Sequence, residues 1–207
     1  GFIGDHLAGH PDKPFMVYYC MPQVHVPHSP PIDFEPDANG IPGSPPNVPV
    51  AGATVGDNLA DMVYEVDLQV GWILRKLEDP DGDGDTSDSI LNNTLVMFTS
   101  DNGGLADDRG ITGYDSTGAL RGSKAMMEEG GHRVPFVAMW NGMIAPGSVS
   151  DQLICGHDWV GAMYALSSQS MAADQAMDAA NILPILLGEQ DEAVPVHDFM
   201  IHQSQNS

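Results

Sequence analysis

Positively charged side chains are scarce in this chain of 207 residues. It has seven lysines and arginines against 29 aspartates and glutamates, which gives a formal net charge of -22. Such a surface repels phosphate backbones and anionic lipid headgroups, so we expect neither nucleic acid nor a membrane as a partner. An anionic substrate would have to be held by a local group of cations or by a bound metal, because the field of the whole chain opposes it.

Long apolar runs and cysteines are also rare. No stretch approaches the roughly 18 consecutive apolar residues of a membrane-spanning helix, and the first residues lack the basic start and apolar run of a signal peptide. Two cysteines, Cys20 and Cys155, are too few for a disulfide framework. Each lies in an apolar stretch, which predicts a small buried thiol. With 42% hydrophobic and 17% charged residues, the chain has the composition of a globular domain or a large part of one.

Apolar patterning predicts alternating strands and helices. Short apolar runs predict three buried strands, at 14–20, 94–99 and 134–140. Helical spacing of apolar residues predicts three helices, at 59–77, 158–166 and 179–187. Asp57 is placed to cap the first of these helices, and Pro184 must lie in a first turn or at a kink. We therefore expect an α/β sandwich with a central, mostly parallel sheet flanked by helices, and ligands beyond the carboxyl ends of its strands.

Two loops differ from the rest by composition. The proline-rich loop 22–50 is expected to run along the surface without helix. In the acidic hairpin 79–89, aspartates alternate with proline or glycine as at the start of a calcium loop. These aspartates are Asp79, Asp81, Asp83 and Asp85. Ile90 stands where the closing glutamate of such a loop belongs, so a solvated acidic tip and a structural calcium site both remain open.

Oxygen ligands for a cation follow the predicted strand 94–99. Asp101 and Asn102 offer adjacent side-chain oxygens, and Gly103 and Gly104 let the backbone approach closely. Hard cations such as Ca²⁺ prefer ligands of this kind. An Asp-Asn-Gly-Gly turn also occurs for purely structural reasons, so on its own it indicates a metal site only weakly.

Three of the seven basic residues gather in one short segment. Arg121, Lys124 and Arg133 lie within 13 positions, which makes this segment the natural place for an oxyanion to bind. The alternative is a set of buried salt bridges, such as Arg133 with Glu129. His25 follows the first predicted strand, where its imidazole could donate to an anion or protonate a leaving group.

In their order along the chain, these segments resemble the sulfatase family, which has the alkaline-phosphatase-like fold. The matching blocks are residues 13–19 with 25–27, 94–104, 120–124, 129–136, 140–142 and 146–153. The resemblance implies that Asp101 and Asn102 are calcium ligands, and that Lys124 holds a sulfate oxygen. It also implies that His25 contacts the sulfate and acts as the acid for the leaving alcohol, in an enzyme that is periplasmic or secreted.

The resemblance also shows which parts of the family pattern this chain lacks. Sulfatases attack sulfur with a hydrated formylglycine, made from Cys or Ser in a Cys/Ser-x-Pro-x-Arg motif. The segment Cys20-Met-Pro-Gln-Val24 has Val24 in place of that arginine. The family's amino-terminal Asp-Asp pair, which supplies the remaining calcium carboxylates, is not found either. We therefore expect residues 1–207 to be the carboxyl-terminal portion of a sulfatase catalytic domain, without the formylglycine segment and the C-terminal subdomain, and inactive alone.

Three functions remain open at this point. The first is a sulfate-ester hydrolase, arylsulfatase-like, which acts on a sulfated small molecule or glycan. The second is a phosphonate or phosphate monoester hydrolase of the same superfamily, although transition-metal members favour histidine where Asn102 stands. The third is a non-catalytic calcium-binding protein on a decayed sulfatase scaffold, which would use the acidic hairpin.

Overall fold

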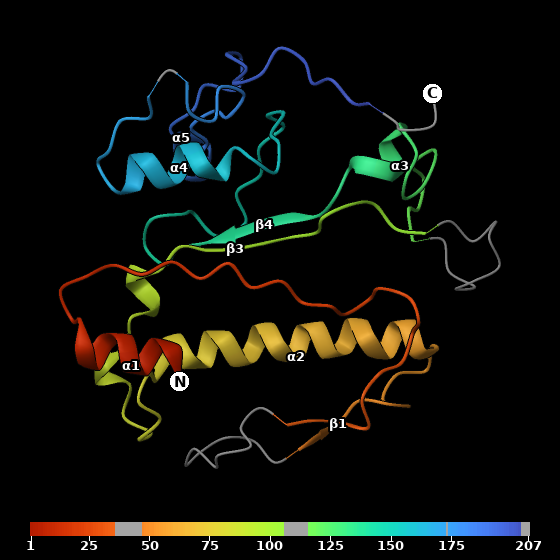
Figure 1. Cartoon of the computed structure of the whole chain (residues 1–207), viewed down its shortest axis with the longest axis vertical. Coiled ribbons are helices and arrows are strands. Elements are labelled where there is room, and N and C mark those ends of the chain that lie inside the picture. The colour runs from red at the N-terminus through yellow and green to blue at the C-terminus, as the bar shows by residue number, and fades with distance from the viewer. Residues whose placement is uncertain (36–46, 106–115, 173, 204–207) are drawn as a thin grey trace. The chain divides into compact units, whose positions relative to one another are not determined.

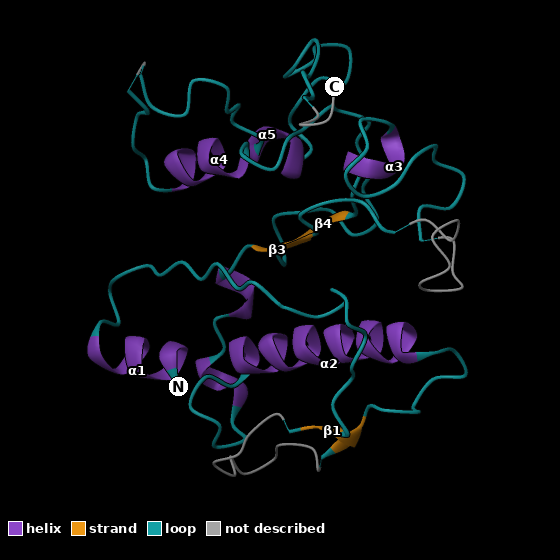
Figure 2. Ribbon diagram, turned by 45° about the vertical axis from the view of Figure 1, so that its right-hand side comes forward, coloured by secondary structure: helices purple, strands orange, loops and turns teal. Residues whose placement is uncertain are grey.

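The computed structural model describes residues 1–35, 47–105, 116–172 and 174–203. The chain divides into two compact units, Gly1–Thr94 and Leu95–Ser207. Figure 1 shows the elements of each unit, and Figure 2 shows that loops make up much of the chain between them. Among the described residues, none of the helices combines the length and the apolar character that crossing a bilayer requires.

The first unit is built on one long helix. Helix α2 (Asn58–Glu78) follows the short α1 (Phe2–Gly9) and the two-residue strands β1 (Asp33–Phe34) and β2 (Val48–Pro49), which pair antiparallel. The Asp57 carboxylate caps α2 by accepting hydrogen bonds from the N–H groups of Leu59 and Ala60, at 2.9 and 3.3 Å. The predicted helix and its cap are therefore confirmed. Two single-turn 3₁₀ helices, Thr86–Asp88 and Leu91–Asn93, lead to the end of the unit.

One face of α2 carries a stripe of buried polar side chains. Asp61, Glu65 and Gln69 follow one another at four-residue spacing, which places them on one side of the helix, and each is at least 93% buried. Buried polar groups are stable only when hydrogen-bonded, and all three have partners. Asp61 accepts from the backbone N–H groups of Gly52 and Thr54, at 2.6 and 2.9 Å, and from the Thr54 hydroxyl at 2.8 Å. The stripe thus fastens the segment that follows the proline-rich loop to the helix.

The same stripe holds the segment that precedes His25. The Tyr19 hydroxyl donates to Oε1 of Gln69 at 3.0 Å, and Nε2 of Gln69 donates to Oε1 of Glu65 at 3.1 Å. Gln23 donates to the same Glu65 oxygen at 2.6 Å. Two hydrogen bonds from separate positions fix residues 19–23 along α2, so the polypeptide reaches His25 from a defined direction.

The prediction of a buried strand at 14–20 is wrong. These residues are extended but belong to no strand, and no described segment pairs with them. Met16, Val17, Tyr18 and Tyr19 are 50–74% exposed. A strand needs a neighbouring strand to satisfy its backbone, and no described strand pairs with this segment. The contact with α2 is made by the Tyr19 side chain, which donates to Gln69. The expected burial of Cys20 fails for the same reason, since this thiol is exposed.

The second unit contains the other two predicted strands. Strand β3 (Val96–Thr99) pairs with β4 (Phe136–Met139), with Val96 opposite Met139 and Thr99 opposite Phe136. The pairing is antiparallel, which corrects the expectation of a mostly parallel sheet for the described strands. Parallel neighbours need a crossover connection that usually contains a helix. Between β3 and β4 the described residues provide only α3 (Glu129–His132), a single turn, and the chain returns in the opposite direction.

Two helices complete the second unit. Helix α4 (Trp159–Leu166) begins after Asp158 and confirms the predicted helix at 158–166. Helix α5 (Leu183–Leu186) is much shorter than the predicted 179–187, with Pro184 in its first turn as expected. A Cβ atom on Gly161 of α4 would overlap the carbonyl of Ala180, so α4 lies directly against the backbone that leads into α5. The start of α4 is therefore fixed by tertiary contacts as well as by its own sequence.

The polar stripe of α2 makes a testable contribution to stability. Replacing Asp61 by asparagine puts an amide donor where two backbone N–H groups and a hydroxyl already converge, so Tm should fall at pH 7. The hydrogen bonds from the Thr54 N–H, the Gly52 N–H and the Thr54 hydroxyl lower the pKa of Asp61 below its usual 3.8. Its stabilising effect is therefore complete above about pH 4 and is lost as the pH falls through the lowered pKa.

Thermal unfolding followed by circular dichroism at pH 7, 5 and 3 measures this effect. The difference in Tm between the wild type and Asp61→Asn should be similar at pH 7 and 5 and smaller at pH 3. Asp67→Asn, at an exposed position of the same helix, is the matched control and should change Tm little. Equal Tm values for the two variants at pH 7 would contradict the role of Asp61.

Candidate functional site

The predicted cation ligands lie in a turn at the carboxyl end of β3. In the turn 100–104, the side chain of Asp101 is exposed and that of Asn102 is half-buried. The Ser100 hydroxyl donates to the carbonyl of Asn102 at 3.2 Å, and Nδ2 of Asn102 donates to the carbonyl of Gly103 at 3.0 Å. No described residue donates a hydrogen bond to Oδ1 of Asn102. The Ser100 hydroxyl also lies 3.5 Å from Oδ1 of Asp101, and the role of these two side chains as cation ligands stays a prediction.

Backbone hydrogen bonds join this turn to the segment with Lys124. The N–H of Lys124 donates to the carbonyl of Gly104 at 2.9 Å, and the N–H of Gly103 donates to the carbonyl of Gly131 at 3.0 Å. The N–H of Gly130 in turn donates to the carbonyl of Arg121 at 2.8 Å. Three segments that are separate in the sequence, 100–104, 121–124 and 128–132, are therefore held together by their main chains.

Glycine is required where these segments meet. A Cβ atom on Gly103 would overlap the carbonyl of Gly130, one on Gly130 would overlap the carbonyl of Gly122, and one on Gly131 would overlap that of Met126. Only a residue without a side chain lets the backbones approach this closely. We call Gly103, Gly130 and Gly131 the glycine contact. It places the candidate cation ligands and the start of the Lys124 side chain in one small region of the second unit.

The three clustered cations differ in their surroundings. Arg121 forms an ion pair with Glu128 at 3.6 Å and Arg133 forms one with Glu129 at 3.4 Å. The expected Arg133 pair therefore exists, but it lies on the surface, where ion pairs stabilise little. Lys124 is half-buried and forms no ion pair with any residue that the structure describes. Of the three, Lys124 is best placed to meet an oxyanion.

His25 lies in the first unit and its ring is exposed. Its Nδ1 lies 2.7 Å from the carbonyl oxygen of Val26. A carbonyl can only accept, so Nδ1 carries a proton and Nε2 is the atom that His25 offers to other groups. The convergence of His25 with Asp101, Asn102 and Lys124, which belong to the second unit, stays a prediction.

The acidic hairpin brings together three of the four aspartates that its sequence singled out. Oxygens of Asp79, Asp81 and Asp83 lie within 4.8 Å of one another. Asp85 is not in this group, and its carboxylate instead caps the turn Thr86–Asp88 by accepting from the N–H of Ser87 at 2.9 Å. Asp88, which sequence spacing did not single out, faces the same charges. Its pKa is raised by burial and then by the nearby charge of Asp81, with smaller effects of Asp79 and Asp83.

A second group of ligating side chains was missed by sequence reasoning. Cys155, Asp158 and His197 meet beside the first turn of α4, although 42 positions separate the first from the last. The cysteine is half-buried, and its pKa is raised by burial and then by the negative charges of Asp158 and Asp178. No spacing rule connects such distant residues. The one available signal was the position of Asp158 at the start of a predicted helix.

Comparison with known proteins decides the family. The family model described as Sulfatase matches residues 2–182. The chain belongs to the sulfatase family. Its structure is similar, over 90% of its length, to a solved structure from the glycosaminoglycan-metabolising locus of Bacteroides thetaiotaomicron, with a TM-score of 0.66 and 26% identity. A solved sulfatase from Pseudoalteromonas sp. matches 65% of the chain with a TM-score of 0.53 and 30% identity.

Sulfatases from other organisms are similar in sequence to most of this chain. It is 29% identical to the steryl-sulfatase of Rattus norvegicus over 96% of its length, and 36% identical to a sulfatase of Formosa agariphila over 72%. The chain spans only 30% and 25% of the lengths of these two relatives. It likewise spans 35% and 25% of the two solved chains.

The glycine contact predicts a sharp difference between two similar substitutions. In Gly131→Ala the new Cβ would overlap the carbonyl of Met126, and relieving this overlap should cost about 1–3 kcal/mol of stability. In Gly156→Ala no atom lies within 4 Å of the new Cβ, so the unfolding free energy should change by about 0.5 kcal/mol or less. Urea unfolding of both variants measures the difference. Equal midpoints would show that the close approach at Gly131 is not needed.

Proposed function

We propose that this sulfatase chain supplies calcium- and sulfate-binding residues to the active site of a sulfate-ester hydrolase, arylsulfatase-like. The observation that carries the proposal is the direct backbone link between the turn with Asp101 and Asn102 and the segment with Lys124. It brings oxygen ligands into one region with Lys124, which forms no ion pair with a described residue, in a chain that belongs to the sulfatase family. We assign this region to the carboxyl-terminal portion of a catalytic domain.

The donor atoms of the turn suit a hard cation. Asp101 and Asn102 provide one carboxylate and one amide oxygen, and Ca²⁺ binds oxygen ligands of both kinds. Ca²⁺ takes six to eight ligands, so these two residues would need carboxylates from elsewhere in a longer protein. Bound calcium would offset negative charge on the sulfate oxygens. Backbone hydrogen bonds hold the turn that carries these two side chains, which would reduce the cost of assembling the site.

Lys124 and His25 would act on the substrate itself. The ammonium group of Lys124 would lie against a sulfate oxygen and stabilise the charge that grows there as the S–O bond to the leaving alcohol breaks. In its imidazolium form, which carries a proton on both ring nitrogens, His25 would give the proton on Nε2 to the oxygen of that alcohol, so that the alcohol leaves uncharged. The hydrogen bond from Nδ1 to Val26 leaves Nε2 as the reacting nitrogen.

The nucleophile is the missing part of this mechanism. A Cys/Ser-x-Pro-x-Arg motif does not occur in the 207 residues, and the exposed Cys20 precedes a segment without the required arginine. We therefore propose that the chain alone does not turn over sulfate esters. In this view the residues described above bind and orient the sulfate, while a formylglycine from another segment would attack it.

A sulfated small molecule or glycan is the substrate class that we propose. Relatives include steryl-sulfatase of Rattus norvegicus and N-acetylgalactosamine-6-O-sulfatase of Bacteroides thetaiotaomicron, and one similar solved structure is a complex with k-i-k-neocarrahexaose. The net charge of -22 repels such polyanions, so binding would depend on Lys124 and the cation. We place substrate selectivity in the proline-rich loop 22–50, whose residues 36–46 lie outside the described part of the chain.

Turnover in a full-length sulfatase that carries this segment tests the proposed roles. Lys124→Ala and His25→Ala should each lower kcat/KM for an aryl sulfate by about 100-fold or more, because each removes a group that acts on transition-state charge. Lys76→Ala and His10→Ala remove the same functional groups from α2 and from the end of α1, and should leave kcat/KM within about twofold. Unchanged turnover in the first two variants would refute their roles. A higher kcat/KM for phosphate than for sulfate esters would favour the phosphate or phosphonate alternative.

Calcium binding separates the enzyme from the non-catalytic alternative. The acidic group Asp79, Asp81 and Asp83 specifically favours a second calcium site, which we propose to be structural. Calorimetry on the same full-length protein should show that Asp101→Ala abolishes a calcium site together with turnover. Asp81→Ala should leave both that site and turnover in place. Loss of all calcium binding in Asp81→Ala, with none in Asp101→Ala, would instead support a calcium-buffering protein.

A further inference from the structure

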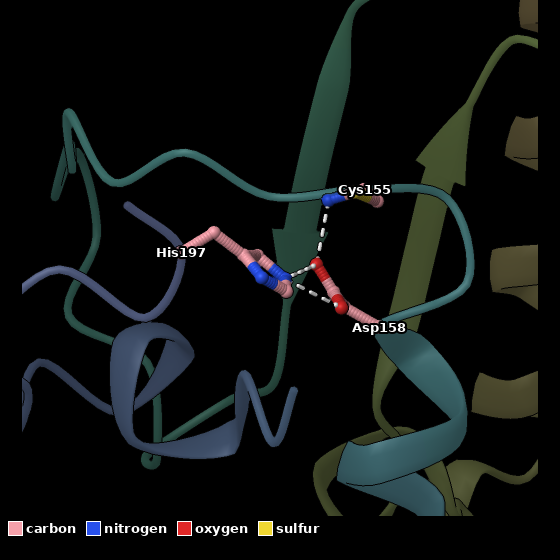
Figure 3. A group of neighbouring side chains, drawn as sticks. All are labelled: Cys155, Asp158 and His197. Atoms are coloured by element: carbon pink, nitrogen blue, oxygen red, sulfur yellow. Dashed lines mark hydrogen bonds and ion pairs between the residues drawn. The ribbon is translucent and has the colours of Figure 1, made fainter. Parts of the chain in front are cut away.

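Cys155, Asp158 and His197 bring three different ligand types to one point of the second unit (Figure 3). A sulfur, a carboxylate oxygen and an imidazole nitrogen lie within 4.8 Å of one another. Zinc binds all three atom types, whereas Ca²⁺ and Mg²⁺ take oxygen ligands. None of the three residues belongs to the set proposed for calcium and sulfate. The chemistry of this group therefore differs from that of the acidic hairpin and of the turn at Asp101.

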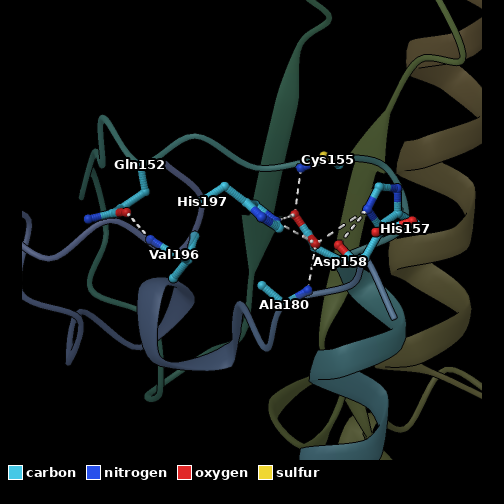
Figure 4. Close-up of polar contacts among 8 residues, drawn as sticks. Gln152, Cys155, His157, Asp158, Ala180, Val196 and His197 are labelled. Carbon is cyan, nitrogen blue, oxygen red and sulfur yellow. Dashed lines mark hydrogen bonds and ion pairs between the residues drawn. The ribbon is translucent and has the colours of Figure 1, made fainter. Parts of the chain in front are cut away.

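The carboxylate of the group is fixed in place before any ligand arrives. Asp158 is fully buried, and its oxygens accept hydrogen bonds from the N–H groups of Cys155 and Ala180, at 2.6 and 2.8 Å. Figure 4 shows these two donors on either side of the carboxylate. Outer-shell hydrogen bonds of this kind orient metal-ligating groups. They also hold Asp158 away from the usual capping position of α4, where it makes no side-chain cap.

The imidazole approaches the same carboxylate from the carboxyl-terminal segment. Nε2 of His197 lies 2.9 Å from Oδ1 and 3.0 Å from Oδ2 of Asp158. Tetrahedral zinc at its usual bond lengths separates nitrogen and oxygen ligands by about 3.3 Å, and either from sulfur by about 3.5 Å. The observed distances from Nε2 of His197 to the two Asp158 oxygens are a few tenths of an ångström shorter than the expected nitrogen–oxygen separation. A small shift of the His197 ring would open the space for an ion.

A cation could reach the group without unfolding the chain. The side chain of His197 is 18% exposed and that of Cys155 is half-buried, so solvent touches two of the three ligands. The neighbouring His157 is half-exposed and, with residues 176–179, lines an open pocket of ≈ 220 Å³. Nε2 of His157, which lines this pocket, lies 3.9 Å from Oδ1 of Asp158.

We propose that Cys155, Asp158 and His197 form a zinc site, with water as the fourth ligand, which fastens the segment around His197 to the start of α4. Binding would exchange the hydrogen bonds between His197 and Asp158 for bonds from both residues to the metal, and the proton of the Cys155 thiol would pass to solvent. Closing a loop of about 40 residues in this way restricts the unfolded chain and so stabilises the folded one.

Cobalt and zinc titrations of the 207-residue chain test the site. With excess Ca²⁺ present to fill the acidic hairpin, Co²⁺ should produce a thiolate charge-transfer absorption, which only a sulfur ligand can give. Calorimetry with Zn²⁺ should show one tight site, and Zn²⁺ should raise Tm. The absence of the absorption from the wild type would overturn the proposal, and the group would then be a hydrogen-bonded Asp158–His197 pair.

Variants identify the ligands. Cys155→Ser and His197→Gln should each weaken Zn²⁺ binding by at least about 100-fold, since loss of outer-shell partners alone costs 10- to 100-fold. Cys155→Ser should also abolish the charge-transfer absorption. The matched control is Cys20→Ser, which removes the exposed thiol of the first unit and should change neither signal. If the absorption were lost in Cys20→Ser but kept in Cys155→Ser, the metal would be bound by Cys20, and the proposed site would be rejected. Circular dichroism of each variant checks that it remains folded.

Discussion

The close approach of backbones at Gly103, Gly130 and Gly131 is the constraint on which the candidate site depends. It lets a turn at the end of β3 exchange main-chain hydrogen bonds with the segment around Lys124. Main-chain bonds fix position independently of side-chain rotamers, so Asp101 and Asn102 start from a defined place relative to Lys124. The exposed side chain of Asp101 and the half-buried side chains of Asn102 and Lys124 are then what a ligand would have to order. The site is thus preorganised by residues that themselves contribute no chemistry.

Much of this arrangement could be predicted from the sequence, because local patterns specify it. The periodicity of α2 and its cap at Asp57 were clear, as were two short apolar strands and the ligand types that follow them. The sequence also indicated that the backbone can approach closely at glycines such as Gly103. Which carbonyls they approach depends on contacts between distant segments, and no local pattern contains that information.

The failures have a common physical cause. An apolar run such as residues 14–20 indicates that a segment could form a strand, but pairing requires a partner whose register the sequence does not state. Here Tyr19 and Gln23 bond instead to buried polar side chains of α2, which a helical pattern of apolar residues gave no reason to expect. The same limit hid the group around Asp158, whose members come from separate segments. The direction of β4 relative to β3 was likewise absent from the local pattern of either strand, because it depends on pairing between separate segments.

The sheet of the second unit also affects how the isolated chain should behave. Each of its two strands has one pairing partner among the described residues, and neither β3 nor β4 carries a charged side chain. An unpaired, uncharged strand edge is a template for adding strands from another molecule, and natural proteins usually protect such edges with lysine, proline or a bulge. The repulsion between highly acidic copies opposes this association, and salt weakens that repulsion. Solutions of low ionic strength should therefore keep the chain dispersed.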